Sequence, residues 1–179
     1  MSRRYAALLR AVNVGGRKLV MADLRRIAAG CGFTAPSTLL ASGNLLLETT
    51  LAPSAAGEAL RLAILGSIDI LTDVFVRDAA QLQAVVAANP FLEAARNEPS
   101  RLAVMFLDRP PQAPLDMLAS DCGMGEQLRS GPDCLYIWTP QGIGASKLSN
   151  ALIERRLGVR GTCRNWNTTG KLCAALMAE

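Results

Sequence analysis

Apolar residues in the first half of the chain alternate between short continuous runs and helical spacing, and this order predicts a βαββαβ unit. Residues 5–12 form an apolar run that Asn13 and the following glycines interrupt, which predicts a buried strand and a turn. Residues 21–30 carry apolar side chains such as Leu24 and Ile27 at the spacing of one helix face. Strands are then predicted at 38–41 and 45–48, a helix at 54–65 and a strand at 73–77.

The same order recurs in the second half, after a linking helix predicted at 79–88 and a boundary at 97–100. The predicted elements are a strand at 101–107, a short helix at 114–119, strands at 127–130 and 135–138, a helix at 146–157, a strand at 162–164 and an extra helix at 168–177. We therefore expect an α+β protein of two ferredoxin-like βαββαβ units with a linking helix and an extra C-terminal helix. The expected division of the chain is 1–78, 79–100 and 101–179.

This topology makes a geometric prediction about the turns. In a ferredoxin-like unit the first two strands are parallel, and the last two are parallel in the opposite sense. The turns at 13–18 and 42–44 should therefore share one edge of the first sheet, and the turns at 142–147 and 165–171 one edge of the second. One strand separates the members of each pair, so they should lie roughly 10 Å apart, a distance that suits a phosphate or a small ligand.

The composition is that of a globular protein with a weak preference for anionic partners. Half of the 179 residues are hydrophobic and 19% are charged, which is enough apolar surface for a buried core. The net charge of +4 favours anions, but no long basic run or tail is present. Aromatic residues make up only 4%, which argues against a surface that stacks many bases or sugars.

Several kinds of chemistry are excluded by residue types that the sequence lacks or does not group. The chain has no histidine, which removes Ser-His-Asp and Cys-His catalysis and histidine-ligated metals. Its five cysteines are scattered and odd in number, so we expect no disulfide framework and no transition-metal site. The apolar run that follows Arg3 and Arg4 is short and is interrupted by Arg10, so we predict neither a signal peptide nor a membrane span and expect a cytoplasmic protein.

The strongest local signal for chemistry lies at 164–168, where a strand is predicted to become a helix. Asn167 is a good N-cap residue, and the free N–H groups of a helix start attract anions. Arg164 would add a fork of donors, Asn165 a further polar group, and Lys171 a positive charge one turn on. The structural alternative is that the asparagine only caps the helix, Trp166 packs and the arginine pairs with a carboxylate.

A second signal lies at 142–147, where two glycines permit a tight turn and Ser146 can cap the next helix. Lys147 follows, and the alternative is a glycine turn with a solvated face. Neither segment is a Walker A loop, because the G-x-x-x-x-G-K-[ST] spacing is absent. The three lysines of the chain, Lys18, Lys147 and Lys171, all lie in glycine- or asparagine-rich turns.

Five segments together resemble domain-of-unknown-function family 1697. They are residues 7–16 (ALLRAVNVGG), 21–24 (MADL), 42–44 (SGN), 142–148 (GIGASKL) and 162–168 (TCRNWNT), in the order that the family has them. The resemblance covers nearly the whole chain and implies a duplicated ferredoxin-like arrangement, but no activity. Ala11 stands where the family usually has glycine. Ala145 stands where an arginine commonly precedes Ser-Lys, which weakens the argument for a strongly cationic pocket.

The leading hypothesis is a protein that binds a small anionic ligand such as a nucleotide or phosphate ester. The candidate ligand-binding residues are Asn13, Lys18, Ser42, Asn44, Ser146, Lys147, Arg164, Asn165, Asn167 and Lys171. One alternative is an enzyme that uses Lys147 or Lys171 with a carboxylate such as Glu154, because a desolvated lysine can act as base or nucleophile.

Two further alternatives stay open. Ferredoxin-like sheets can display RNA-binding faces, but the chain has no aromatic stripe of the RNP type. The motifs can also be purely structural, since a fold does not define a function. The sequence assigns no catalytic residue and implies no cofactor.

Overall fold

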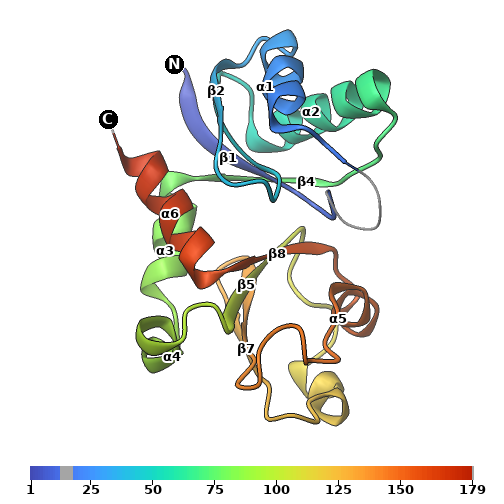
Figure 1. The fold of residues 1–179 in the computed structure, drawn as a ribbon, viewed down its shortest axis with the longest axis vertical. Helices are drawn as coiled ribbons and strands as arrows, with labels where there is room; N and C mark the ends of the chain where they lie inside the picture. The colour runs from blue at the N-terminus through green and yellow to red at the C-terminus, as the bar shows by residue number, and fades with distance from the viewer. Residues whose placement is uncertain (13–17, 179) are drawn as a thin grey trace. The chain divides into compact units, whose positions relative to one another are not determined.

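The computed structural model describes residues 1–12 and 18–178 and confirms the α+β class with two ferredoxin-like units (Figure 1). The elements of the first half are β1 (Arg3–Leu9), α1 (Met21–Gly30), β2 (Thr34–Thr38), β3 (Asn44–Thr49), α2 (Pro53–Ile68) and β4 (Val74–Asp78). The helices α3 (Ala79–Ala87) and α4 (Leu92–Asn97) follow. The second half contains β5 (Leu102–Leu107), the 3₁₀ helix η1 (Leu115–Asp121), β6 (Gln127–Gly131), β7 (Cys134–Trp138), α5 (Asn150–Leu157), β8 (Gly161–Asn165) and α6 (Trp166–Met177).

Each half forms its own four-stranded antiparallel sheet with the same connectivity. The strand orders are β2-β3-β1-β4 and β6-β7-β5-β8, so the first strand of each half lies between the third and the fourth. This order is that of a ferredoxin-like unit. The duplication predicted from the order of elements is therefore confirmed.

The compact units divide the chain inside α3. One unit is Met1–Leu82 with Ala174–Glu179, and the other is Gln83–Cys173. Helices α3 and α6 each contribute residues to both units. In the first unit, Arg4 donates a hydrogen bond to the main-chain oxygen of Ala178, which joins the end of α6 to β1.

In each unit the helices that follow the first and third strands pack on one face of the sheet. The first core joins Leu24 of α1 and Leu60 of α2 to strand residues such as Leu47, all fully buried. The second core joins Ile153 of α5 and Leu118 of η1 to Met105 and its neighbours. In the helices and strands alike, apolar residues recur at the spacing that places them on one face, and these faces meet in the core. In the described residues, no helix is both long and apolar enough to cross a membrane.

Some predicted boundaries are wrong, for identifiable reasons. The strand predicted at 38–41 lies instead at Thr34–Thr38, and Pro36 within it is tolerated because β2 is an edge strand with an irregular register. The helix expected from residue 146 begins at Asn150, where the Ser149 side chain accepts a hydrogen bond from the Leu152 N–H. Helix α4 was not predicted.

Candidate functional site

The ends of β7 and β8 lie at one edge of the second sheet. Ile137 of β7 and Asn165 of β8 both pair with Ala103, on opposite sides of β5. Both strands are antiparallel to β5 and so run in the same direction. With one strand between them, the strand ends are separated by about 10 Å. The segments that carry the strongest sequence signals therefore begin at a common edge.

Arg164, which was expected to offer a fork of donors to an anion, is buried. The residue is only 7% exposed, and its Nη1 donates hydrogen bonds of 2.8 Å to Thr162 Oγ1 and to the Cys163 main-chain oxygen. Burial lowers the pKa of the guanidinium to about 10, against the opposing effect of Cys163. The side chain thus forms hydrogen bonds within its own strand.

The cap of α6 is Asn165 rather than Asn167. Asn165 Oδ1 accepts a 2.9 Å hydrogen bond from the Thr168 N–H, and the helix begins at Trp166. Asn167 therefore lies in the first turn, where its side chain is exposed, and Lys171 is exposed one turn later. The capping role predicted for Asn167 is wrong, because the strand ends one residue before the helix begins.

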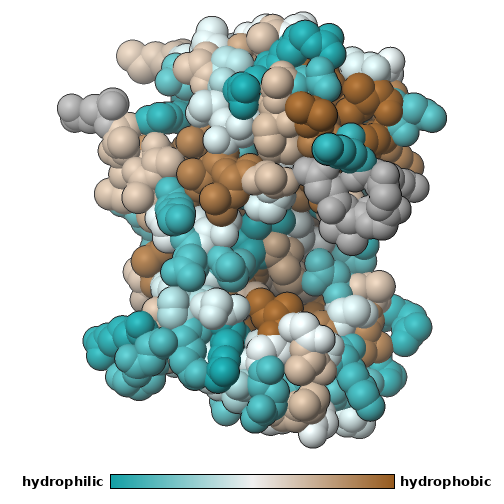
Figure 2. All heavy atoms as spheres, in the orientation of Figure 1, coloured by the Kyte–Doolittle hydropathy of each residue, from teal (hydrophilic) through white to brown (hydrophobic). Residues whose placement is uncertain are grey.

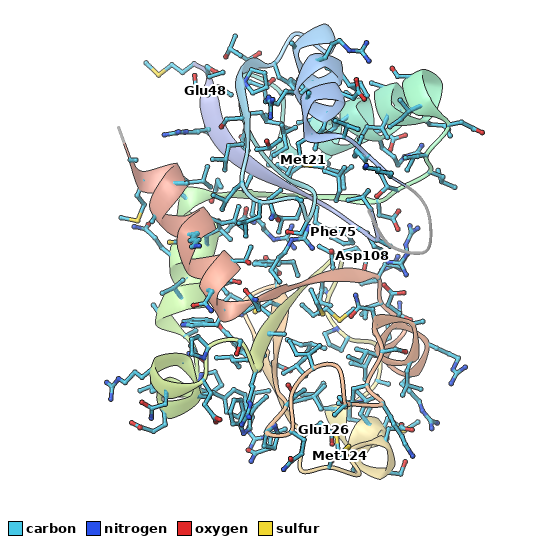
Figure 3. All side chains as sticks on the ribbon, in the orientation of Figure 1. Met21, Glu48, Phe75, Asp108, Met124 and Glu126 are labelled. Atoms are coloured by element: carbon cyan, nitrogen blue, oxygen red, sulfur yellow. The ribbon has the colours of Figure 1, made fainter. Side chains whose placement is uncertain are left out.

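Ser146 holds a buried carboxylate instead of capping a helix. Its Oγ donates a 2.7 Å hydrogen bond to Glu126 Oε1 and accepts one from the Leu148 N–H. Glu126, 7% exposed, also accepts a 2.8 Å bond from the Met124 N–H, beside which it lies in Figure 3. Burial alone would raise the pKa of Glu126, but the Ser146 hydroxyl and the main-chain N–H donors outweigh it and lower the pKa. Lys147 is exposed.

Two of the N-terminal candidates, Ser42 and Asn44, belong to a turn that hydrogen bonds close. Asn44 is fully buried and its Nδ2 donates 2.9 Å hydrogen bonds to the Leu39 carbonyl and to Ser42 Oγ. Gly43 between them has φ +73°, and a Cβ there would meet the Val12 side chain at 2.4 Å. Asn44 therefore stabilises the turn, while the Ser42 and Lys18 side chains are exposed. Asn13 lies outside the described residues.

The environment of the enzymatic candidates does not activate them. Lys147 and Lys171 are exposed, whereas a nucleophilic lysine needs desolvation. Glu154 Oε1 accepts the Gly161 N–H at 3.1 Å, at the start of β8. Burial raises the pKa of the Cys163 thiol to about 12, with a weaker lowering effect from Arg164, so this thiol is not an activated nucleophile.

The second sheet offers no exposed aromatic face of the RNA-binding kind. Phe106 and Tyr136 lie on the sheet face opposite the α5 core, and both are fully buried. Tyr136 Oη donates a 2.6 Å hydrogen bond to the Val85 carbonyl of α3. Its ring is therefore unavailable for stacking on a base.

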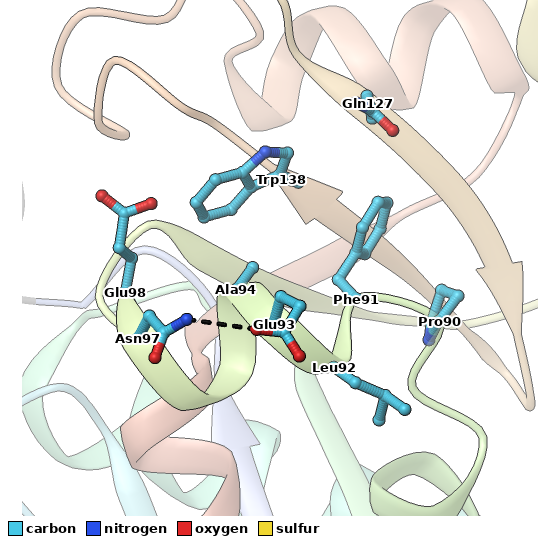
Figure 4. Close-up of a pocket in the computed structure, with 9 residues that line it drawn as sticks. All are labelled: Pro90, Phe91, Leu92, Glu93, Ala94, Asn97, Glu98, Gln127 and Trp138. Atoms are coloured by element: carbon cyan, nitrogen blue, oxygen red, sulfur yellow. Dashed lines mark hydrogen bonds between the residues drawn. The ribbon is translucent and has the colours of Figure 1, made fainter.

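A groove of about 530 Å³ lies elsewhere in the second unit, between α4 and the ends of β6 and β7 (Figure 4). It is lined by Pro90, Phe91, Leu92, Glu93, Ala94, Asn97, Glu98, Gln127 and Trp138. None of the nine candidate residues that the structure describes lines it. In the view of Figure 4, the Trp138 ring lies between Glu98 and the Phe91 ring.

Strand pairing determines where the sheet side of the groove lies. Gln127 and Trp138 are paired across β6 and β7, so their side chains share a face. Trp138 is also paired with Leu102 of β5. The Arg129 guanidinium, two residues along β6 on that face, lies 5.9 Å from the centroid of the Phe91 ring. This cation–π contact joins the segment before α4 to the sheet.

The helix side of the groove is polar and acidic. Glu93 accepts hydrogen bonds of 3.3 Å from Arg96 and from Asn97 Nδ2. Glu98 forms an ion pair with Arg101. Figure 2 shows hydrophilic side chains gathered over α4. The groove thus combines the aromatic rings of Trp138 and Phe91 with the carboxylates of Glu93 and Glu98.

Sequence reasoning missed this groove because it did not predict α4. Trp138 is only the last residue of the strand predicted at 135–138, and Pro90 lies two residues beyond the linking helix predicted at 79–88. The available signal was an aromatic residue directly after Asn89-Pro90 in a chain with few aromatics. Within residues 1–12 and 18–178, no group of three or more His, Cys, Asp or Glu side chains is placed to hold a metal ion.

Comparisons with known proteins support the fold and the family. A solved structure, the conserved bacterial protein SP0830 from Streptococcus pneumoniae, is 20% identical and superposes with a TM-score of 0.73. The match covers 98% of this chain and 99% of that one, and at this identity it supports the fold alone. No curated protein is significantly similar to the chain. The family described as "Protein of unknown function (DUF1697)" matches residues 1–136, and the chain therefore belongs to the DUF1697 family.

Proposed function

We propose that this protein binds a small organic molecule in the groove between α4 and the ends of β6 and β7. The observation that carries the proposal is the groove itself, whose volume of about 530 Å³ is formed within one unit. Small-molecule sites typically have volumes of about 300–1,000 Å³ and combine apolar walls with a few polar groups.

The lining supplies both kinds of contact. Trp138, Phe91 and Leu92 provide apolar surface, and the amides of Asn97 and Gln127 can donate and accept hydrogen bonds. Trp138 is paired with neighbouring strands on both sides, so the main chain that carries the indole is held in place before a ligand arrives. A preformed wall of this kind reduces the ordering cost of binding.

The experiment is a fragment screen followed by two-dimensional ¹H–¹⁵N NMR. The chain has two tryptophans, so the indole N–H of Trp138 reports on the groove and that of Trp166 is an internal reference. We expect fragments that shift the Trp138 indole signal together with amides of α4. Ala94→Phe should fill the groove and remove these shifts.

The matched control is Ala84→Phe, which adds the same ring at an exposed position of α3 outside the groove. Binding should survive in this variant. Fragments that still bind Ala94→Phe, or that shift only residues away from α4, would contradict the proposal.

Anion binding at the C-terminal turns stays a separate prediction. Exposed Lys147, Asn167 and Lys171, and the common edge of β7 and β8, favour it, while the internal hydrogen bonds of Arg164 and Ser146 count against it. Inorganic phosphate in the same NMR experiment tests it. Saturable shifts at Lys147 and Lys171, without a response of Trp138, would support this second candidate.

A further inference from the structure

We infer that the ligand of the α4 groove is a small organic cation, an amine or ammonium compound with an apolar or aromatic body. This inference rests on the proposed function, because it names the chemical class that the same groove would take. Three features of the lining support it: its charge, its aromatic rings and the weakness of its present ion pairs.

The charge of the lining is opposite to that of the whole chain. Glu93 and Glu98 are the ionisable residues among the nine that line the groove, and no lysine or arginine lines it. The chain as a whole carries a net charge of +4. Both carboxylates are paired with arginines outside the lining, Arg96 and Arg101, so a ligand cation is favoured only where it takes the place of these partners.

The aromatic rings add a second attraction for positive charge. The faces of tryptophan and phenylalanine rings carry partial negative charge, and tryptophan is the strongest of the side chains in binding cations. The Arg129 guanidinium already lies 5.9 Å from the centroid of Phe91, so Trp138 is the ring of the groove that a ligand cation would contact. In the view of Figure 4 the indole of Trp138 is drawn between Glu98 and Phe91, and all three residues line the groove.

The arginines that now pair with the carboxylates can be displaced at little cost. The Arg96 and Glu93 side chains are 71% and 79% exposed, and those of Arg101 and Glu98 are 44% and 41% exposed. Exposed ion pairs contribute little because water screens them and long side chains lose freedom when they form. Because a ligand ammonium at the same carboxylates is screened in the same way, its additional contact with Trp138 is what favours displacement.

The test compares three probes with the same ring and different charge: phenethylamine, 2-phenylethanol and 3-phenylpropionate. The Trp138 indole signal is followed by NMR as each probe is added up to millimolar concentrations. We expect phenethylamine to bind at least about tenfold more tightly than either of the others, which corresponds to 1.4 kcal/mol. Added salt should weaken this preference.

Two variants separate local charge from net charge. Glu98→Gln removes one carboxylate of the groove, and Glu58→Gln removes an exposed carboxylate of α2 in the other unit. Glu98→Gln should reduce the preference for the amine several-fold, and the double variant Glu93→Gln/Glu98→Gln should abolish it. Glu58→Gln should leave the preference unchanged.

The outcomes distinguish the class of ligand from the existence of the site. If the alcohol or the carboxylate shifts Trp138 at concentrations as low as the amine does, the inference is wrong while the groove remains a binding site. The same holds if Glu58→Gln and Glu98→Gln weaken amine binding equally. If no probe shifts Trp138, the inference is overturned, while the proposed function is decided by the fragment screen.

Discussion

The hydroxyl group of Tyr136 donates a 2.6 Å hydrogen bond to the main-chain oxygen of Val85, which joins β7 to α3 within the second unit. Tyr136 is fully buried, and Gly131 leaves room for its ring: a Cβ there would lie 2.3 Å from Tyr136 Cε2. The face of β7 that carries Tyr136 is thus hydrogen-bonded to α3, the helix that precedes the groove-lining residues of the segment 90–98.

Replacing Tyr136 with phenylalanine should lower the free energy of unfolding by about 1–2 kcal/mol, because the buried Val85 carbonyl loses its donor. Chemical denaturation at neutral pH measures this change.

Burial raises the pKa of the Tyr136 hydroxyl, with a smaller contribution from Cys134. The folded state therefore holds this proton more tightly than the unfolded state, and stability should fall as the pH rises above about 10. Tyr136→Phe should lose less stability in that range than the wild type, and equal losses would contradict this assignment.

Arg164→Ala and Lys147→Ala should differ in their effects on stability. Arg164 is buried and donates to Thr162 and to the Cys163 carbonyl, so its removal should cost about 1–3 kcal/mol. Lys147 is exposed, and Lys147→Ala should change stability by less than about 0.5 kcal/mol. Thermal melting of both variants measures the difference. A melting temperature of Arg164→Ala equal to that of the wild type would contradict this structural role.

Ser146→Ala should destabilise the protein by about 1–3 kcal/mol near neutral pH, because the buried Glu126 carboxylate loses a hydroxyl donor. Ser67→Ala, at an exposed position of α2, is the matched control and should be nearly neutral. The pKa of Glu126 is lowered, so its contribution is present above the ordinary value of about 4.3 and is lost as the pH falls. The loss of unfolding free energy caused by Ser146→Ala should therefore become smaller in acid. A loss that does not depend on pH would contradict the role of the Glu126 carboxylate as the partner of Ser146.

Gly170→Ala should stabilise the protein by about 0.5–1 kcal/mol. Gly170 is exposed within α6, and a Cβ there would meet no atom within 4 Å, so alanine removes only the entropic cost of glycine in a helix. Gly131→Ala, with the same chemical change, should instead destabilise by about 1–3 kcal/mol because its Cβ would overlap Tyr136. Parallel denaturation curves measure both, and a change of the same sign in the two variants would contradict the packing described.

Much of the fold follows from local periodicity. The helix predicted at 21–30 has the bounds observed for α1, and its apolar face carries the buried residues Leu24 and Ile27. The strand at β2 was misplaced because its irregular register and Pro36 obscure the alternation of side chains. Helix α4 was missed because its six residues include no buried one, so no apolar face marks it.

The candidate site was less predictable than the fold. Asparagine, serine and arginine in a turn suit a ligand and a structural hydrogen bond equally well, and residue type alone does not distinguish these roles. In the structure, Arg164, Asn165 and Ser146 all form internal hydrogen bonds. Lys147 differs from these three residues, because its side chain is exposed.

The sequence by itself determined the order and type of most elements, the duplicated α+β unit and the absence of histidine chemistry. These properties depend on composition and on apolar spacing within about ten residues, where helix and strand geometry apply directly. Only the tertiary structure decided which polar groups are used internally and where a groove forms. Ser146 meets Glu126 from 20 residues away, and Tyr136 meets Val85 from 51. The groove likewise forms where α4 packs near Trp138, about 40 residues later in the chain. Because such contacts form between separate segments, no local sequence pattern encodes them.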